Sequence, residues 1–264
     1  MSGAASREHG GWNRLPFLIA HRGYSSLAPE NTLAAFERAL AAGAEVLECD
    51  VQLSRDGVVV VLHDPDLDRT TDGHGPVREM DWEQIHRLDA GYSERFGNAY
   101  ADQRIPRLEQ VLELARGRAQ VFVEIKPEAV GGERDGIEAR TLLAARRTGM
   151  QADIGVLSFA PRPLRRLRQM APEMPLGLVF RWWRQRRLVE ETLDVGADYL
   201  VVYAARLLAL RHLVDRAHRR ELRVGAYVVD SEEHLQALLQ LGVDGIATNR
   251  VGDLIPGLAA PHLR

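Results

Sequence analysis

The sequence predicts an α/β protein that folds as a (β/α)8 TIM barrel with a small inserted cap subdomain. Two observations carry this prediction. Short β-branched runs alternate with helical patterns throughout the 264 residues, and the length suits one barrel, which commonly takes about 250 residues. The alternation is interrupted only early in the chain, by a hairpin and a turn-rich stretch. A doubly wound open sheet is the alternative architecture.

The expected strands are short apolar runs, and most of them are separated by patterns with apolar residues three or four positions apart. Strands are predicted at residues 17–21, 45–53, 120–126, 154–159, 176–180, 199–203, 224–229 and 245–248. Helices are predicted at residues 32–42, 108–116, 134–147, 163–170, 184–195, 207–219 and 232–241. Strands that alternate with helices form a parallel sheet, and eight of them close a barrel.

Two segments break this alternation. Asp56-Gly57 predicts a two-residue turn that joins the second strand to a run at residues 58–63, and this hairpin would place Asp50 opposite His63. Residues 65–104 contain many turn residues and no sustained periodicity. Because a structureless loop of this length is unusual in a compact domain, we expect an inserted cap at the barrel rim, within one domain over residues 1–264.

Charge and composition exclude several classes of protein. The 34 basic and 37 acidic residues give a net charge of −3, so no global basic field for nucleic acid is expected. One cysteine, Cys49, cannot form an intrachain disulfide. Residues 17–20 are too short for a signal-peptide core, and no run approaches the roughly 20 apolar residues of a membrane span. We therefore expect a cytoplasmic protein without a transmembrane segment; its oligomeric state stays open.

His21 and Arg22 stand at the end of the first predicted strand, followed by Gly23, which permits a sharp exit. Active sites of barrels form at the carboxyl ends of the strands. Arginine offers a planar fork that matches phosphate oxygens, and histidine exchanges protons near neutral pH. The structural alternative is a histidine bonded to the backbone and an arginine in a salt bridge.

Two carboxylates, Glu48 and Asp50, share one face of the second predicted strand, while apolar residues occupy the other face. The apolar face can pack under the helices, which puts the carboxylates inside the barrel. Two like charges in a space of low dielectric are costly unless a cation compensates them, and carboxylate oxygens suit Mg²⁺ or Ca²⁺. The alternative is a solvated strand face.

Glu124 and Lys126 share a face of the next predicted strand, and Lys126 is the only lysine of the chain. An inward-facing Glu124 would supply a third carboxylate to the same cation. A lysine at the strand end could meet a phosphate oxygen as a point charge. The alternative is a buried Glu–Lys ion pair.

These segments together resemble the glycerophosphodiester phosphodiesterase family. The resemblance is carried, in order along the chain, by His21-Arg-Gly, Pro29-Glu-Asn-Thr32, Glu48-Cys-Asp50, Asp56-Gly through His63-Asp64, Asp68-Arg-Thr-Thr-x-Gly-x-Gly75, Ile105-Pro-x-Leu108 and Glu124-Ile-Lys126-Pro. It extends more weakly to Leu157-Ser-Phe159, Tyr227-Val-Val229 and the last strand. The ordered set spans essentially the whole chain. It implies a barrel with a small insertion and a divalent metal held by three carboxylates.

The resemblance also implies a role for each matched residue. His21 and His63 become the general acid/base pair, and Glu30 and Asn31 organise the site, although capping of the first helix by Asn31 or Thr32 would also explain their presence. The remaining roles are metal binding by Glu48, Asp50 and Glu124 and phosphate binding by Arg22 and Lys126.

The implied activity is metal-dependent hydrolysis of a small-molecule glycerophosphodiester to glycerol 3-phosphate and an alcohol, with Mg²⁺ or Ca²⁺ as cofactor. One alternative is lysophospholipase D-type hydrolysis of lysophospholipids. Another is a barrel that binds a phosphate ligand without catalysis. The chain departs from the usual family pattern at the barrel mouth, with Tyr227-Val-Val-Asp230 in place of Trp-Thr-Val-Asn and Thr248-Asn249 in place of Thr-Asp.

Overall fold

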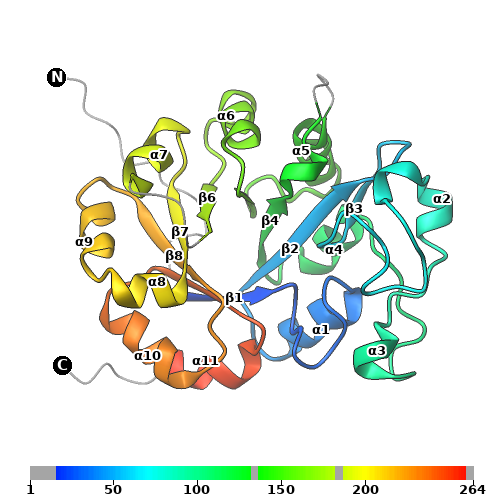
Figure 1. Cartoon of the computed structure of the whole chain (residues 1–264), viewed down its shortest axis with the longest axis horizontal. Helices are drawn as coiled ribbons and strands as arrows, with labels where there is room; N and C mark the ends of the chain where they lie inside the picture. Colours follow the sequence, from blue (N-terminus) through cyan, green and yellow to red (C-terminus); the bar gives the residue numbers. More distant parts are fainter. Residues whose placement is uncertain (1–15, 132–135, 182–186, 260–264) are drawn as a thin grey trace.

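A closed ring of parallel strands forms the centre of the protein (Figure 1). The computed structural model describes residues 16–131, 136–181 and 187–259. In these ranges the ring consists of β1 (Phe17–His21), β2 (Val46–Leu53), β4 (Gln120–Ile125), β5 (Ile154–Ser158), β6 (Leu176–Phe180), β7 (Tyr199–Tyr203), β8 (Arg223–Tyr227) and β9 (Gly245–Thr248). Strand β1 pairs in parallel with both β2 and β9, which closes the ring. The predicted (β/α)8 barrel is confirmed, and an open sheet is excluded.

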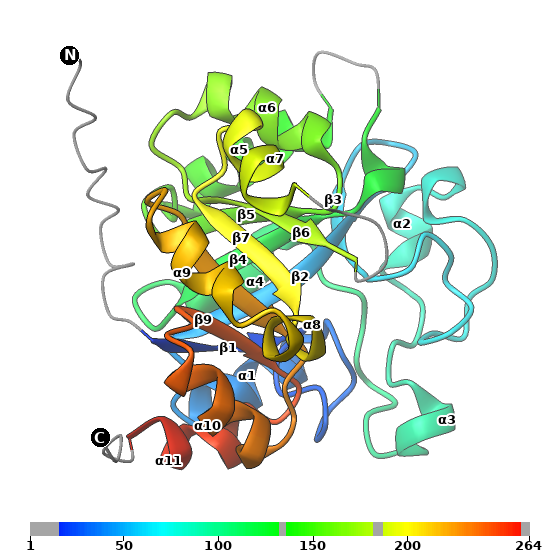
Figure 2. The ribbon, with the colours of Figure 1, turned by 60° about the vertical axis from the view of Figure 1, so that its left-hand side comes forward.

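In the described part of the chain, helices pack around the outside of this ring. Helices α5, α6 and α7 lie on one side of it, and α10 and α11 lie on another (Figure 2). They are α1 (Leu33–Ala41), α4 (Leu108–Ala115), α5 (Ile137–Thr148), α6 (Pro161–Met170), α7 (Leu188–Asp194), α8 (Ala204–Ala209), α9 (His212–His218), α10 (Glu232–Gln240) and α11 (Val251–Ala259). None of the helices in the described ranges has the length and apolar character needed to cross a bilayer. The predicted starts of two helices, at residues 134 and 184, lie outside the described residues.

The single helix predicted at residues 207–219 is instead two helices, α8 and α9. The N–H of Leu210 donates to the carbonyls of Arg206 and Leu207, and φ and ψ of −117° and 54° at Leu210 end the first helix. The apolar pattern continues through this break because Leu210 itself packs against the core. A change of direction that keeps the same face buried leaves no mark in hydrophobic periodicity.

Two apolar layers separate the outside of the barrel from its inside. Leu47, Cys49 and Val51 of β2 lie in the large cluster between strands and helices, as the alternation predicts. Inside the ring, Phe122 packs on Phe17 and on the edge of Tyr199, with centroids 6.4 and 5.5 Å apart. Apolar rings therefore fill the interior near the strand starts, and polar side chains occupy the carboxyl ends.

The hairpin after β2 has a three-residue loop, where the sequence predicts a two-residue turn. Strand β3 (Val59–Val61) runs antiparallel to β2, and the N–H of Ser54 donates to the carbonyl of Val58 at 3.0 Å. Gly57 adopts a left-handed φ of 81°, which is the conformation that a three-residue hairpin loop requires at its last position.

This longer loop shifts the hairpin register by one residue. Asp50 lies opposite Leu62, whose N–H donates to the Asp50 carbonyl at 3.0 Å, so the predicted pairing of Asp50 with His63 is wrong. His63 follows the end of β3, where the strand alternation no longer decides the direction of its side chain. It reaches the carboxylates all the same, by the contacts described below.

Between β3 and α4 the chain forms short helices beside the barrel. They are η1 (Val77–Glu79), α2 (Trp82–Ile85) and α3 (Ser93–Phe96). In Figure 1, α2 lies next to β3, and α3 lies lower, on the side of α1. Their own apolar cluster contains Val60, Leu62, Leu67, Val77, Ile85, Ala90 and Ile105. The predicted cap at residues 65–104 falls in this segment; its standing as a subdomain within one domain stays a prediction.

Candidate active site

The chain turns sharply where β1 ends, and this turn directs backbone and side chain of Arg22 toward the second strand. Arg22 and Gly23 have left-handed φ values of 56° and 81°, and a Cβ at Gly23 would lie 2.6 Å from the carbonyl carbon of Ala35. Only glycine fits this approach. The turn brings the N–H of Arg22 within 2.9 Å of Oε2 of Glu48.

Glu48, Asp50 and Glu124 come together inside the barrel mouth. Asp50 and Glu124 are register partners on β2 and β4, and one oxygen of each of the three carboxylates lies within 4.8 Å of the others. All three side chains are buried, with Asp50 at 0% exposure. Within the described part of the chain, Oε1 of Glu48 is buried and accepts no hydrogen bond. The three predicted metal-ligating side chains therefore form one cluster with an unsatisfied oxygen.

Two cations lie against this cluster. The Lys126 ammonium is 2.5 Å from Oε1 of Glu124 and 2.7 Å from Oδ1 of Asp50. Nε of Arg22 lies 3.1 Å from Oδ2 of Asp50. The two residues predicted to contact phosphate are thus placed beside the carboxylates, and Lys126 forms the buried ion pair that the sequence left open as its alternative.

The cluster has more negative charge than its neighbours neutralise. Burial and the charge of Asp50 raise the pKa of Glu48 well above its usual range, and burial also raises the pKa of Glu124. Burial acts in the same direction on Asp50, but the charges of Lys126 and Arg22 hold its pKa well below the usual range. Three buried carboxylates with an orphaned oxygen fit a divalent cation, because hard oxygen donors are the ligands that Mg²⁺ and Ca²⁺ prefer.

Glu30 connects the end of β1 to the segment after β3. Its Oε1 accepts hydrogen bonds from Nη1 of Arg22 and Nη2 of Arg69, each at 2.8 Å, and its Oε2 accepts from Nη1 of Arg69 at 3.1 Å. A carboxylate between two guanidinium groups fixes both of them. This contact agrees with an organising role for Glu30.

Asn31 and Thr32 divide the two functions that the sequence left open for them. The Thr32 hydroxyl accepts from the N–H of Ala35 at 3.3 Å and caps α1. Asn31, with a left-handed φ of 61°, donates to Oδ2 of Asp50 at 2.8 Å and accepts from the Asp50 N–H at 3.2 Å. Asn31 therefore orients a carboxylate of the cluster, and the helix cap belongs to Thr32.

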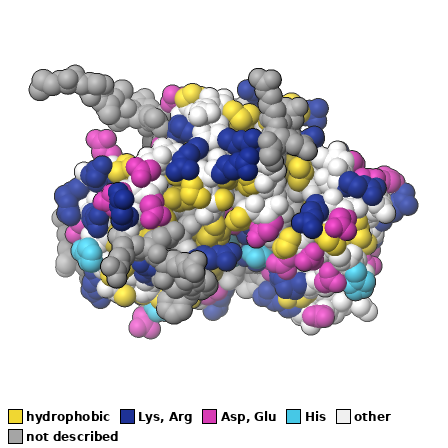
Figure 3. Space-filling model, turned by 45° about the horizontal axis from the view of Figure 1, so that its top comes forward, with side chains coloured by type: hydrophobic (Ala, Val, Ile, Leu, Met, Phe, Trp, Pro, Cys, Tyr) yellow, Lys and Arg dark blue, Asp and Glu magenta, His cyan; other side chains and the backbone are white. Residues whose placement is uncertain are grey.

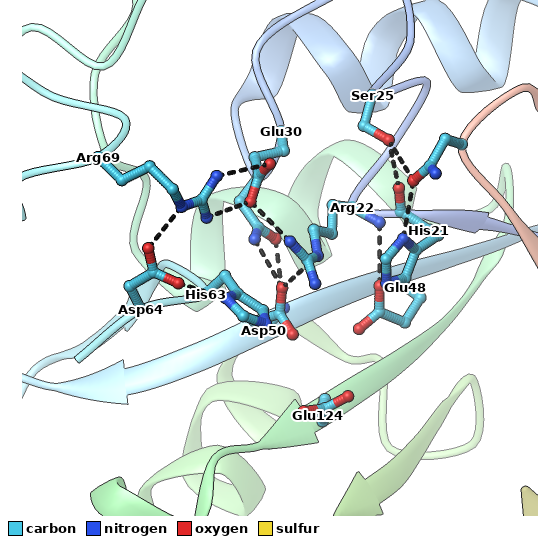
Figure 4. Close-up of polar contacts among 12 residues, drawn as sticks. His21, Arg22, Ser25, Glu30, Glu48, Asp50, His63, Asp64, Arg69 and Glu124 are labelled. Carbon is cyan, nitrogen blue, oxygen red and sulfur yellow. Dashed lines mark hydrogen bonds and ion pairs between the residues drawn. The ribbon is translucent and has the colours of Figure 1, made fainter. Parts of the chain in front are cut away.

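His63 is held by two residues to which the sequence assigned no role. Its Nδ1 lies 2.5 Å from Oδ1 of Asp64, and Oδ2 of Asp64 accepts from Nε of Arg69 at 2.5 Å. Figure 4 shows this chain of contacts running from Arg69 to the imidazole beside Asp50. Asp64 follows His63 directly, and Arg69 lies in one of the motifs that carry the family resemblance. These positions are the only hint in the sequence that the two residues belong to the site.

His21 approaches the cluster from β1. Its Nδ1 lies 2.8 Å from Oδ1 of Asn249, and burial lowers its pKa to about 4. After those of Lys126 and Arg22, the charges of His63 and His21 also hold the pKa of Asp50 low. The structure therefore brings together the two predicted imidazoles and the three predicted acids, as Figure 4 shows.

Charged and apolar side chains line the pocket together. His21, Glu48 and Glu124 belong to it, and so do apolar side chains of the same strands, such as Phe17 of β1 and Phe122 of β4, and of β5 to β9. The Tyr227 hydroxyl donates to the Phe180 carbonyl at 3.0 Å, which fixes an aromatic ring in the pocket wall. On the face seen in Figure 3, acidic and histidine side chains lie next to a hydrophobic strip, with basic side chains around them.

The chain is similar to known proteins over most of its length. The model of the glycerophosphoryl diester phosphodiesterase family matches residues 21–253. A glycerophosphodiester phosphodiesterase of Caldanaerobacter subterraneus subsp. tengcongensis is 36% identical over 240 residues, which cover 90% of this chain and 96% of the relative. Another, from Bacillus subtilis, is 30% identical over 242 residues, covering 88% and 82% of the two chains.

Solved structures show the same similarity. A glycerophosphodiester phosphodiesterase from Agrobacterium tumefaciens superposes with a TM-score of 0.78 at 30% identity, over 90% of this chain and 98% of its own. An Oleispira antarctica phosphodiesterase in complex with the product sn-glycerol-3-phosphate superposes with a TM-score of 0.80 at 28% identity, over 93% and 98%. With the family model matching most of its length, the chain belongs to the glycerophosphoryl diester phosphodiesterase family, whose members are phosphoric diester hydrolases.

Proposed function

We propose that this enzyme hydrolyses glycerophosphodiesters to glycerol 3-phosphate and an alcohol, with His21 and His63 as its general acid/base pair. The observation that carries the proposal is that both imidazoles approach the cluster of three buried carboxylates at the barrel mouth (Figure 4). Hydrolysis of a phosphodiester needs charge compensation on the phosphate, an activated nucleophile and a protonated leaving group. The pocket contains side chains for each requirement.

Glu48, Asp50 and Glu124 would hold one divalent cation, Mg²⁺ or Ca²⁺. When bound, the cation supplies charge neutralisation at the phosphate oxygens, a large contribution to phosphoryl chemistry. It also compensates the carboxylates that Lys126 faces in the described structure. The charges of Lys126 and Arg22 are then available to the phosphate at the barrel mouth.

The two histidines would move the protons. One imidazole takes the proton of the attacking hydroxyl as the new bond to phosphorus forms. The other gives a proton to the alcohol oxygen as its bond to phosphorus breaks. Each transfer contributes roughly 10²–10⁴-fold to the rate. If the attacking hydroxyl is that of water, its oxygen stays on phosphorus and this water is the one consumed. If it is the neighbouring glycerol hydroxyl of the substrate, a cyclic phosphate forms, and attack by water then opens it and consumes one water. Proton exchange with solvent returns both rings to their starting states.

The experiment measures glycerol 3-phosphate released from glycerophosphocholine, glycerophosphoethanolamine and glycerophosphoglycerol. We expect turnover by the full chain and none by His21→Ala or His63→Ala, while His234→Ala, which changes an exposed histidine of α10, keeps it. Full activity of either site variant would refute the acid/base assignment. Faster turnover of lysophosphatidylcholine would favour the lysophospholipase D-type reaction, and binding without product release would favour a non-catalytic barrel.

A further inference from the structure

His21 is held by a pair of residues at the ends of β8 and β9. Oδ1 of Asn249 lies 2.8 Å from Nδ1 of His21. Nδ2 of Asn249 donates to Oδ2 of Asp230 at 2.7 Å, and its backbone N–H donates to Oδ1 of Asp230 at 2.8 Å. The Thr248 hydroxyl donates to the same Oδ1 at 3.0 Å. Asp230 is therefore surrounded by donors and anchors the carboxamide of Asn249.

This anchor decides which end of the carboxamide faces the histidine. A carboxylate accepts hydrogen bonds and donates none, so the NH₂ group of Asn249 must point to Asp230. Its oxygen then points to His21. The Ser25 hydroxyl lies 2.9 Å from the same Oδ1 and 3.0 Å from the His21 carbonyl oxygen. Because a hydroxyl donates only one proton, the contact with Asp230 is the one that fixes the orientation of the carboxamide.

The orientation of Asn249 decides the tautomer of His21. A carboxamide oxygen only accepts, so Nδ1 of His21 must carry the proton in their hydrogen bond. In the neutral ring, Nε2 is then unprotonated and has a lone pair to accept a proton. A flipped carboxamide would present its NH₂ group to Nδ1 and select the opposite tautomer. In a serine-protease triad the corresponding error costs about 10⁴ in kcat.

We propose that Asp230 and Asn249 are a positioning pair that holds His21 in its Nδ1-protonated tautomer, with Nε2 as the proton acceptor. The catalytic value of this arrangement rests on the proposed function. The two residues bond each other, so they form a pair of one donor and one acceptor.

Exchange variants test the pair by activity. In Asp230→Asn the carboxamide of Asn249 is free to flip, and in Asn249→Asp two carboxylates meet at a 2.7 Å contact. We expect each single variant to lose at least about ten-fold in kcat with KM changed about two-fold or less. The double variant D230N/N249D restores one donor and one acceptor, and we expect kcat at least about ten-fold above the better single variant. Additive losses in the double variant would overturn the pairing.

A matched control separates positioning from general stability. Thr248→Val removes a donor to Asp230 but leaves the contact between Asp230 and Asn249. We expect Thr248→Val to lower the unfolding temperature as much as Asp230→Asn does, while kcat falls about two-fold or less. Equal losses of kcat in the two variants would show a merely structural role.

A measurement without substrate keeps this proposal distinct from the proposed function. The ¹⁵N chemical shifts of the His21 ring, assigned with His21→Gln, should show a protonated Nδ1 and a bare Nε2 in the full chain. In Asp230→Asn the two nitrogens should shift toward the opposite tautomer. A protonated Nε2 in the unaltered protein would overturn the positioning pair. Activity of His21→Ala would refute the proposed function and leave the tautomer result standing.

Discussion

The ammonium nitrogen of Lys126, the residue after β4, lies 2.5 Å from Oε1 of Glu124 on that strand and 2.7 Å from Oδ1 of Asp50 on the neighbouring strand β2. The only lysine of the chain is thus a counter-ion inside the carboxylate cluster. Removal of one partner from a buried ion pair leaves an uncompensated charge, which costs more than the pair itself contributes.

Loss of this ammonium should therefore destabilise the protein when no divalent cation is present. We expect Lys126→Met to lower the free energy of unfolding by about 3–5 kcal/mol in chelator, measured by urea denaturation. Lys126→Arg is the matched control, because it keeps the charge, and should lose less stability. Mg²⁺ should recover most of the loss in Lys126→Met. A Lys126→Met protein as stable as the unaltered chain in chelator would contradict the counter-ion role.

Asp64 should matter for turnover through His63. The carboxylate at 2.5 Å from Nδ1 of His63 orients the ring, and Asp64→Asn would allow an NH₂ group to face it. We expect kcat to fall about 10²-fold or more, measured by release of glycerol 3-phosphate. The control is Asp68→Asn, which alters an exposed Asp–His pair with His74 at 3.0 Å. Equal kcat values for the two variants would contradict the orienting role of Asp64.

Glu48 should make the stability of the metal-free protein depend on pH. Because its pKa is raised well above 4.5 in the folded state, the folded protein binds a proton where the unfolded chain has released it. The resulting stabilisation is fully present below pH 4.5 and is lost as the pH rises through the folded pKa. It amounts to about 1.4 kcal/mol for each unit by which the pKa is raised.

Glu48→Gln removes this titration and keeps the shape of the side chain. In chelator, the unfolding free energy of the unaltered chain minus that of Glu48→Gln should therefore fall as the pH rises from 4.5. Urea denaturation at a series of pH values measures the difference. A difference that is constant with pH, or that rises, would contradict the raised pKa of Glu48.

The alternation of strand residues was enough to predict where the acids lie. In β2 the apolar residues Leu47 and Cys49 pack outward, which forces Glu48 and Asp50 inward, and the same reasoning holds for Glu124 in β4. Side chains of a strand alternate between its two faces with a period of two residues, and this local pattern can be recognised in the sequence. The barrel itself is predicted by another local property, the alternation of strand and helix patterns along the chain.

Features that depend on one loop residue or on distant partners were not predictable in this way. Gly57 is the third residue of the hairpin loop, and this extra residue shifts the register by one. An Asp-Gly pair occurs both in two-residue turns and at the end of three-residue loops, so the sequence did not distinguish them. Asn249 meets His21 across 228 positions of the chain, because β9 closes the barrel against β1. No local pattern marks such a contact, and only the closure of the ring creates it.

The central claim is that the three buried carboxylates beside the two histidines hold one divalent cation. Calorimetric titration of Mg²⁺ or Ca²⁺ into the chelator-treated full chain tests it most directly. We predict one ion per chain for the unaltered protein and for inactive His63→Ala, and affinity at least about ten-fold lower for Glu48→Gln and Glu124→Gln. Unchanged affinity in both carboxylate variants, or no bound ion in a protein that turns over substrate, would contradict the account.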